Sequence, residues 1–285
     1  MAVTAASLVD GDREMILAPR ADVRLQQLDA PFPAVREEAD EATDDDGTDD
    51  QTEFFGARAC AVKLLVLKGP RAVEDELSRF SHPRTRPYLV VSDDEWSGPR
   101  RLKLRADQQS APIGVDLAPS QREIQAQWKC PDAVWEAVDL VTEVIGADVT
   151  TVRVGFTAPL VFPLTLAATT SAGATQITNI GAVPSHFVAR LYGPCVAPSL
   201  INESTGEEIT FQSTLALAAG EYVEVSTRDR SAFLLSDTSQ SRLGYLDFAA
   251  TSWFRIEPGD SQVRYVPSSA DAGASAEIDY RPSWL

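Results

Sequence analysis

The carboxyl-terminal half of the chain consists of short alternating segments, and this pattern constrains the fold more than any other feature. From Val149 onward, ten segments of alternating apolar and polar residues follow one another, among them HFVARLYG, EYVEVST and SQVRYVP. Gly, Pro, Asn, Asp and Ser separate these segments at spacings of roughly 8–14 residues, which is typical of β-sandwiches and jelly rolls. We therefore predict an antiparallel β-sandwich over residues 147–285.

The amino-terminal half is predicted to be mainly β as well. Its strongest strand pattern is FFGARACAVKLLVLKG, in which alternate residues from Cys60 to Val66 share one face. Further strands are predicted at RPYLVVS (86–92), RRLKLRAD (100–107) and REIQAQW (122–128). The segment PDAVWEAVDLV (131–141) has helical spacing of its valines, but its β-branched residues leave helix and strand both open. Gly146 then marks the expected boundary between domains 1–146 and 147–285.

One helix is predicted in this half, at AVEDELSRFSH (72–82). Val73, Leu77 and Phe80 recur at helical spacing and form an apolar stripe. The acidic run 74–76 suits the positive amino-terminal end of a helix. We therefore expect one short helix to pack on the amino-terminal sheets.

An acidic loop is predicted at residues 37–53, where ten carboxylates occur with no basic residue. The chain carries a formal net charge of −17, so this segment supplies more than half of the excess. Such a balance argues against a surface that grips nucleic acid, although it permits DNA to slide past without sticking. If Gly47 stood at position 6 of a calcium-binding loop, Asp44, Asp46 and Glu53 would fall at ligand positions. Position 1 is then Ala42 and no helix flanks the loop, so a solvated acidic loop is favoured over a metal site.

No motif for catalysis or for a cofactor is found. Cys60, Cys130 and Cys195 are far apart, and neither a disulfide framework nor a zinc site is indicated. Only His82 and His186 could serve as imidazole bases, and no known nucleophile or nucleotide motif accompanies them. No signal peptide or apolar run long enough for a membrane span is present, so we expect folding in a reducing cytoplasm without membrane insertion.

Carbohydrate binding on a β-sandwich would use exposed aromatic rings. Trp253 and Trp284 are the candidates for such a platform, together with three tyrosines of the same half. Alternating apolar residues flank each of them, so packing in the core is the competing interpretation.

An ordered series of turn motifs resembles one family. These are N-x-G-x-x-P from Asn179, R-x-Y-G-P-C from Arg190, N-x-x-T-G from Asn202, A-A-G-E from Ala218 and W-x-x-x-x-P-G from Trp253. DGTDDQTEFFGAR (46–58), RPYL (86–89) and RRLKLRADQQSAPI (100–113) agree in the first half. The series is similar to the siphovirus distal tail proteins, also called minor tail proteins in phages of actinobacteria.

The resemblance implies a tail-tube-like amino-terminal domain that forms a ring, usually a hexamer, and a galectin-like carboxyl-terminal sandwich. It implies a structural, non-enzymatic role at the virion tail tip after assembly in the host cytoplasm. The expected neighbours are the tail tube protein, the tape measure protein and the tail-associated hub or spike, with DNA only as passing cargo.

Within that ring, Phe54, Phe55 and Arg58 are the predicted interface residues, because their strand needs a neighbour to cover its end. The acidic loop 37–53 would then line the channel or face solvent. A module that recognises host-wall glycan is the alternative function, and a wall-degrading hydrolase is a third.

Overall fold

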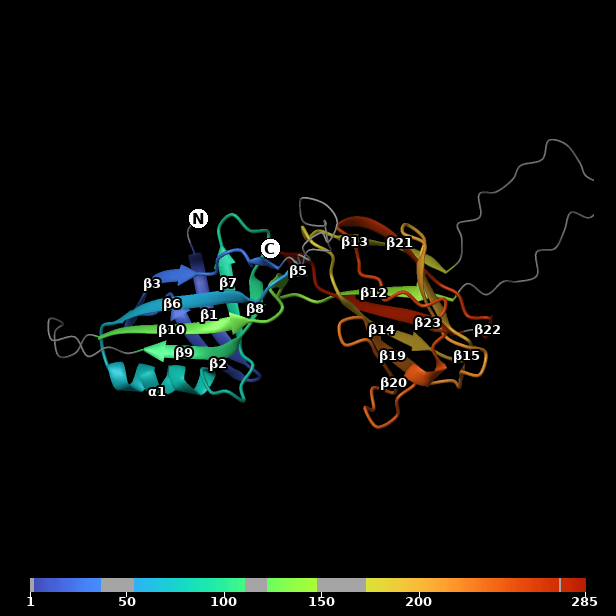
Figure 1. The fold of residues 1–285 in the computed structure, drawn as a ribbon, viewed down its shortest axis with the longest axis horizontal. Coiled ribbons are helices and arrows are strands. Elements are labelled where there is room, and N and C mark those ends of the chain that lie inside the picture. Colours follow the sequence, from blue (N-terminus) through green and yellow to red (C-terminus); the bar gives the residue numbers. More distant parts are fainter. Residues whose placement is uncertain (1–2, 37–53, 111–121, 148–172, 272) are drawn as a thin grey trace, which may run out of the picture. The chain divides into compact units, whose positions relative to one another are not determined.

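The computed structural model describes residues 3–36, 54–110, 122–147, 173–271 and 273–285 (Figure 1). The chain divides into two compact units, and each is described by itself. The amino-terminal unit comprises residues 1–138 with Trp284 and Leu285, and the carboxyl-terminal unit comprises residues 139–283. No helix among the described residues is long and apolar enough to cross a membrane.

Two antiparallel sheets and one helix form the amino-terminal unit (Figure 1). The six-stranded sheet has the order β2 (Arg13–Ala18), β1 (Val3–Asp10), β7 (Tyr88–Asp93), β8 (Arg100–Lys103), β11 (Trp135–Ala137), β24 (Ser283–Trp284). The four-stranded sheet has the order β3 (Val23–Asp29), β6 (Arg58–Val66), β10 (Arg122–Cys130), β9 (Arg105–Ser110). A two-stranded ribbon pairs β4 (Val35–Arg36) with β5 (Phe54–Phe55).

Period-two alternation places one face of each strand in a shared core. Cys60, Val62, Leu64 and Val66 on β6 are all buried, as predicted. The paired strand β10 alternates in the same way, and its Trp128 lies opposite Cys60. Both sheets and the helix contribute to one hydrophobic cluster, so the unit has a single core.

The predicted helix is confirmed as α1 (Pro70–Phe80), which buries Val73, Leu77 and Phe80. It begins two residues earlier than expected, because Gly69 adopts φ 66° and Pro70 then enters the first turn. The acidic run therefore lies beyond the first turn, and the expectation that it faces the amino-terminal end of the helix was wrong. Two of its residues form ion pairs instead: Glu74 with Arg122, and Glu76 with Arg20 at 3.0 Å.

Three local features of this unit were missed, wrongly predicted or left open by the sequence. The hairpin of β1 and β2, which turns at Gly11 with φ 60°, was not predicted. RRLKLRAD is not one strand, since the chain passes from β8 to β9, and thus between sheets, at Leu104. The segment 131–141 contains no helix: Trp135–Ala137 form β11, which pairs with β8.

The division between the units also differs from the boundary expected at Gly146. Strand β12 (Val141–Gly146) pairs along its whole length with β23 (Ser275–Tyr280), so it belongs to the carboxyl-terminal unit. At the other end, Trp284 and Leu285 belong to the amino-terminal unit. The chain therefore leaves the first unit and returns to it.

Antiparallel sheets also form the carboxyl-terminal unit (Figure 1). The five-stranded sheet has the order β12, β23, β14 (Phe187–Tyr192), β19 (Tyr222–Ser226), β20 (Ser231–Leu234). A four-stranded sheet has the order β13 (Ala174–Asn179), β21 (Gly259–Tyr265), β16 (Ser199–Asn202), β17 (Glu207–Thr210), and a three-stranded sheet has the order β18 (Ala216–Leu217), β15 (Cys195–Val196), β22 (Ser269–Ala270). All three contribute to one hydrophobic cluster. The predicted mainly β fold with one short α-helix is confirmed over the described residues. Two of the ten predicted segments, 150–156 and 160–168, lie outside them.

The turn motifs have physical causes in this unit. Asn179 is buried, and its Nδ2 donates to the carbonyls of Val183 and Ile256 and to the Ser185 hydroxyl. Its Oδ1 accepts from the Gly181 amide at 2.8 Å. A Cβ at Gly181 would lie 2.4 Å from the Ser283 carbonyl oxygen, so only glycine fits. The motif N-x-G-x-x-P therefore encodes one buried amide that holds a turn, with no role in chemistry.

Candidate functional site

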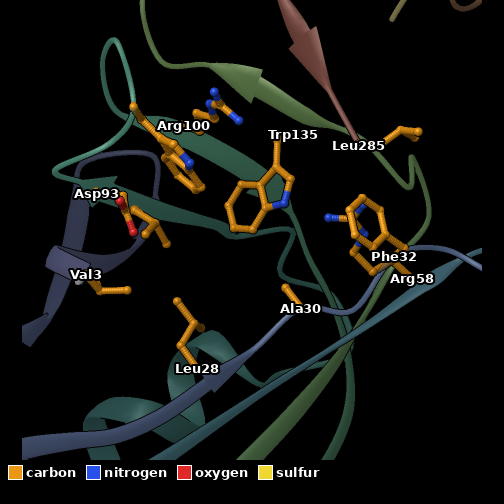
Figure 2. A pocket seen from close by; sticks show the side chains of 11 residues that line it. Val3, Leu28, Ala30, Phe32, Arg58, Asp93, Arg100, Trp135 and Leu285 are labelled. Atoms are coloured by element: carbon orange, nitrogen blue, oxygen red, sulfur yellow. The ribbon is translucent and has the colours of Figure 1, made fainter. Parts of the chain in front are cut away.

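The amino-terminal unit contains a cavity of about 410 Å³ whose lining combines aromatic rings with charged groups (Figure 2). Leu28, Ala30 and Phe32 come from the end of β3 and the segment after it, and Phe32 is 77% exposed. Trp135 of β11 stands in the middle of the view. The charged residues of the lining are Arg58, Asp93 and Arg100.

Arg58 is the first residue of β6 and shares the core-facing side of that strand with Cys60 and Val62. It is only 2% exposed, and neither Nε nor Nη2 has a hydrogen-bond partner among the residues that the structure describes. Burial lowers the pKa of Arg58 below its ordinary value, since a desolvated guanidinium is costly. A buried charge of this kind is normally paired, so Arg58 is the least satisfied polar group of the cavity.

Arg100 lies on β8, and aromatic rings cover it on two sides. Its guanidinium carbon is 4.3 Å from the centre of the Trp96 ring and 4.0 Å from that of Trp284. Trp96 also makes an edge contact with Trp135, with ring centres 5.6 Å apart. Burial lowers the pKa of Arg100, and the nearby Asp93 carboxylate partly offsets that effect. This stacking fixes Trp284 to the amino-terminal unit.

The predicted interface residues Phe54, Phe55 and Arg58 lie in β5 and at the start of β6. Phe54 and Phe55 form β5, in which Phe55 pairs with Val35. Arg58 follows closely but is buried in its own unit. The metal candidates Asp44, Asp46 and Glu53 lie outside the described residues. Within the described ranges, no group of three or more His, Cys, Asp or Glu side chains is placed to hold a metal ion.

The two tryptophans proposed for a glycan platform lie in different units. Trp253 is half-buried and packs against the core of the carboxyl-terminal unit. Trp284 stacks on Arg100 in the amino-terminal unit. The residues that sequence reasoning missed are Trp96, Arg100 and Trp135. The only available signal was the closeness of Trp96 and Arg100 in EWSGPR, because Trp135 and Trp284 join them through the fold alone.

The carboxyl-terminal unit has its own charged cluster on the five-stranded sheet. Arg190 of β14 contacts Glu224 at 3.1 Å, Glu277 at 2.7 Å and Asp279 at 2.8 Å. Burial alone would lower the pKa of Arg190, but hydrogen bonds to Asp279 and Glu224 outweigh it and raise the pKa. Thr142 donates to Asp279 at 2.6 Å. Every charge in this cluster is paired, as expected for a structural network.

The surroundings of the three cysteines and the two histidines fit structural roles. All three cysteines are free and buried. A hydrogen bond with Cys130, together with burial, raises the pKa of the Cys60 thiol, and burial raises that of Cys195. His82 accepts from the Arg84 amide at 3.1 Å, and His186 lies just before β14, at the strand start predicted for it. A nucleophilic thiol needs a lowered pKa, so Cys60 and Cys195 are poor nucleophiles.

The similarity of this chain to known proteins is found in its fold. No family model matches the sequence, and no curated protein is similar to it in sequence. Among solved structures, the crystal structure of SPP1 Dit (gp 19.1), a hub adsorption apparatus protein of phages that infect Gram-positive bacteria, matches with a TM-score of 0.65. The identity is 13%, and the match covers 98% of this chain and 99% of that chain. The chain has the fold of a phage distal tail protein.

A second solved structure also matches nearly the whole chain. It is the phage P2 baseplate in its activated conformation with Ca, which matches with a TM-score of 0.50 at 11% identity over 97% of each chain. Because both matches run through nearly the whole chain, the distal-tail-protein fold includes both units in their order along the sequence.

Proposed function

We propose that the protein is a structural subunit of the tail tip of a long-tailed bacteriophage, where it joins the tail tube to the hub and adhesion apparatus. The observation that carries this proposal is the near full-length likeness to SPP1 Dit. Fold alone does not specify function, but this likeness covers both units and has no large unmatched part on either chain. A role without catalysis agrees with the raised pKa values of Cys60 and Cys195.

The amino-terminal unit is the proposed ring-forming part, with six copies in the ring. Head-to-tail contacts between copies must close under rotation, which requires complementary surfaces on each subunit. Strands β2 and β24 end the six-stranded sheet, and β3 and β9 end the four-stranded sheet. Edge strands carry unpaired backbone groups that a neighbouring chain can cover. This supply of edges supports assembly through the amino-terminal unit.

The tail tube protein, the tape measure protein and the hub or spike are the proposed neighbours of the ring. The net charge of −17 supports DNA as passing cargo, because an acidic wall repels the phosphate backbone. The carboxyl-terminal unit is the proposed galectin-like domain. Its role is architectural, since Trp253 packs against the core and offers no free ring platform.

Two measurements test this function. A density map of the virion should place this chain in a closed ring at the lower end of the tail tube. Native mass spectrometry of the purified protein should show a closed oligomer, with six copies expected. Only monomers in solution together with absence of the chain from the tail tip would overturn the proposal.

A further inference from the structure

The outward face of the five-stranded sheet in the carboxyl-terminal unit combines aromatic rings with charged side chains. Buried and half-buried residues alternate along β14, so Arg190 and Tyr192 point away from the core. Tyr222 and Glu224 of β19 do so for the same reason. The side chains of Arg190 and Glu224 are 27% and 25% exposed, so water reaches this face of the sheet.

Two tyrosines of this face form an aromatic pair. Tyr192 lies directly opposite Tyr222 in the sheet, and their ring centres are 5.1 Å apart with planes inclined at 48°. Burial raises the pKa of Tyr192, and the nearby Glu277 carboxylate adds to that effect. The pair therefore stands beside the charged cluster of Arg190. Aromatic rings next to a few fixed polar groups are typical of small-molecule sites.

Hydrogen bonds join the polar side chains of this face into one network. The Tyr222 hydroxyl donates to the Ser236 hydroxyl at 2.9 Å, and Ser236 donates to Glu224 at 2.8 Å. Glu224 also accepts from Arg190, which donates to Glu277 at 2.7 Å. A carboxylate can accept about four hydrogen bonds. Within the described residues Glu224 uses two of these positions and Glu277 one, so the network is fixed in place and keeps acceptors for a ligand.

The loop that supplies Ser236 has a strained backbone. Leu235 and Ser236 have φ values of 52° and 57°, in the left-handed region that favours glycine. Such a conformation costs roughly 1–3 kcal/mol per residue and is concentrated at ligand sites, where it preorganises polar groups. Here it places the Ser236 hydroxyl between Tyr222 and Glu224, while the Leu235 side chain is left 44% exposed. The loop therefore presents a hydroxyl group at the expense of burying a leucine.

We propose that this face of the sheet binds a neutral saccharide. A sugar has an apolar C–H face and a rim of hydroxyls, so its ring packs on Tyr192 and Tyr222. Its hydroxyls donate to the open acceptor positions of Glu224 and Glu277. Three carboxylates accompany the single guanidinium of the network, so an anionic sugar or a phosphate-linked glycan is repelled. This site adds a ligand to the architectural role of the unit and does not depend on the ring.

The test is saturation-transfer difference NMR on the full chain. The probes are glucose, galactose, mannose, rhamnose and N-acetylglucosamine, with glucuronic acid as the matched anionic sugar. Tyr222→Ala removes one ring of the pair, and Glu224→Gln removes a charge at nearly constant shape. Phe248→Ala is the control, because Phe248 is a 64% exposed ring outside β14 and β19. Calorimetry verifies that the carboxyl-terminal unit of each variant is folded.

At least one neutral sugar should give a signal with the wild-type protein, and glucuronic acid should give a weaker one. Tyr222→Ala should lower the affinity roughly tenfold, because the sugar loses one aromatic contact. Glu224→Gln should lower the affinity as well, since a charged acceptor forms the stronger hydrogen bond. Phe248→Ala should bind as the wild-type protein does.

Three results would overturn this inference. No signal from any of the five neutral sugars would reject the site. Equal affinity of Tyr222→Ala and the wild-type protein would show that binding occurs elsewhere on the chain. A stronger signal from glucuronic acid than from the neutral sugars would reject the ligand class. None of these results bears on the proposed tail-tip ring, which the virion map tests separately.

Discussion

Arg58 in the amino-terminal unit and Arg190 in the carboxyl-terminal unit both lie on strands inside a sheet, yet their surroundings differ. Arg190 contacts three carboxylates of its own sheet. Arg58 is more deeply buried, and two of its nitrogens have no hydrogen-bond partner in the described part of the chain. Within the described residues, the carboxyl-terminal unit surrounds its arginine with carboxylates of the same sheet, whereas the amino-terminal unit buries Arg58 on the core-facing side of β6. Substitutions in each unit test this contrast, with calorimetry that resolves one unfolding transition for each unit.

The largest effect is expected from Asn179→Ala in the carboxyl-terminal unit. The change removes the amide that donates to the Val183 and Ile256 carbonyls and to the Ser185 hydroxyl, and it takes away the oxygen that accepts from the Gly181 amide. We expect the free energy of unfolding of this unit to fall by about 3 kcal/mol, so that the Tm of only one transition decreases. Asn202→Ala is the matched control, because Asn202 is equally buried but its Nδ2 has no partner, and it should cost much less. Equal losses would show that burial matters more than the hydrogen bonds.

Arg190→Met should destabilise the same unit by roughly 2–3 kcal/mol. Three carboxylates would then face one another on one sheet without their shared cation. The Tm of the same transition as for Asn179→Ala should fall. Substitution of the exposed Arg255 by Met should leave that Tm unchanged. If Arg190→Met raised the Tm, the contrast between the two units would fail.

Alkaline pH should weaken the carboxyl-terminal unit through Tyr265. Burial, assisted by a hydrogen bond with Cys195, raises the pKa of Tyr265 above its ordinary value of 10.0. The folded state keeps a proton that the unfolded chain releases, so this stabilisation is complete below pH 10 and falls as pH rises above it. The loss approaches about 1.4 kcal/mol per pH unit. When the free energy of unfolding is measured against pH, Tyr265→Phe should lose less stability above pH 10 than the wild-type protein does. An equal loss in both proteins would contradict this prediction.

Trp284→Ala should lower the stability of the amino-terminal unit by about 1 kcal/mol, because Arg100 loses one of its two stacked rings. Trp253→Ala provides the comparison, since that ring packs on the other core. The two variants should move different transitions. If both variants lowered the Tm of the same transition, the assignment of Trp284 to the amino-terminal unit would be wrong.

The sequence predicts those parts of the fold that depend on local period. Alternation identified β6, β7, β10 and most strands of the second half, and helical spacing identified α1. The hairpin of β1 and β2 was missed, and β11 remained ambiguous, because partner strands decide such short segments.

Only part of the candidate site could be predicted. Arg58 falls in phase with Cys60 and Val62, so its burial could be inferred from the alternation alone. The surroundings of its guanidinium could not, because they depend on side chains from several elements that meet only in the folded unit. The stacking of Arg100 between Trp96 and Trp284 is likewise invisible, since those tryptophans stand at distant positions of the chain.

The return of the chain to its first unit at Trp284 sets an order of events during synthesis. A ribosome makes β11 long before β24, so the six-stranded sheet waits for its last strand until the carboxyl-terminal unit has been translated. Until then Arg100 is covered on one side only. Nascent chains thus carry an unfinished amino-terminal unit until Trp284 has been added.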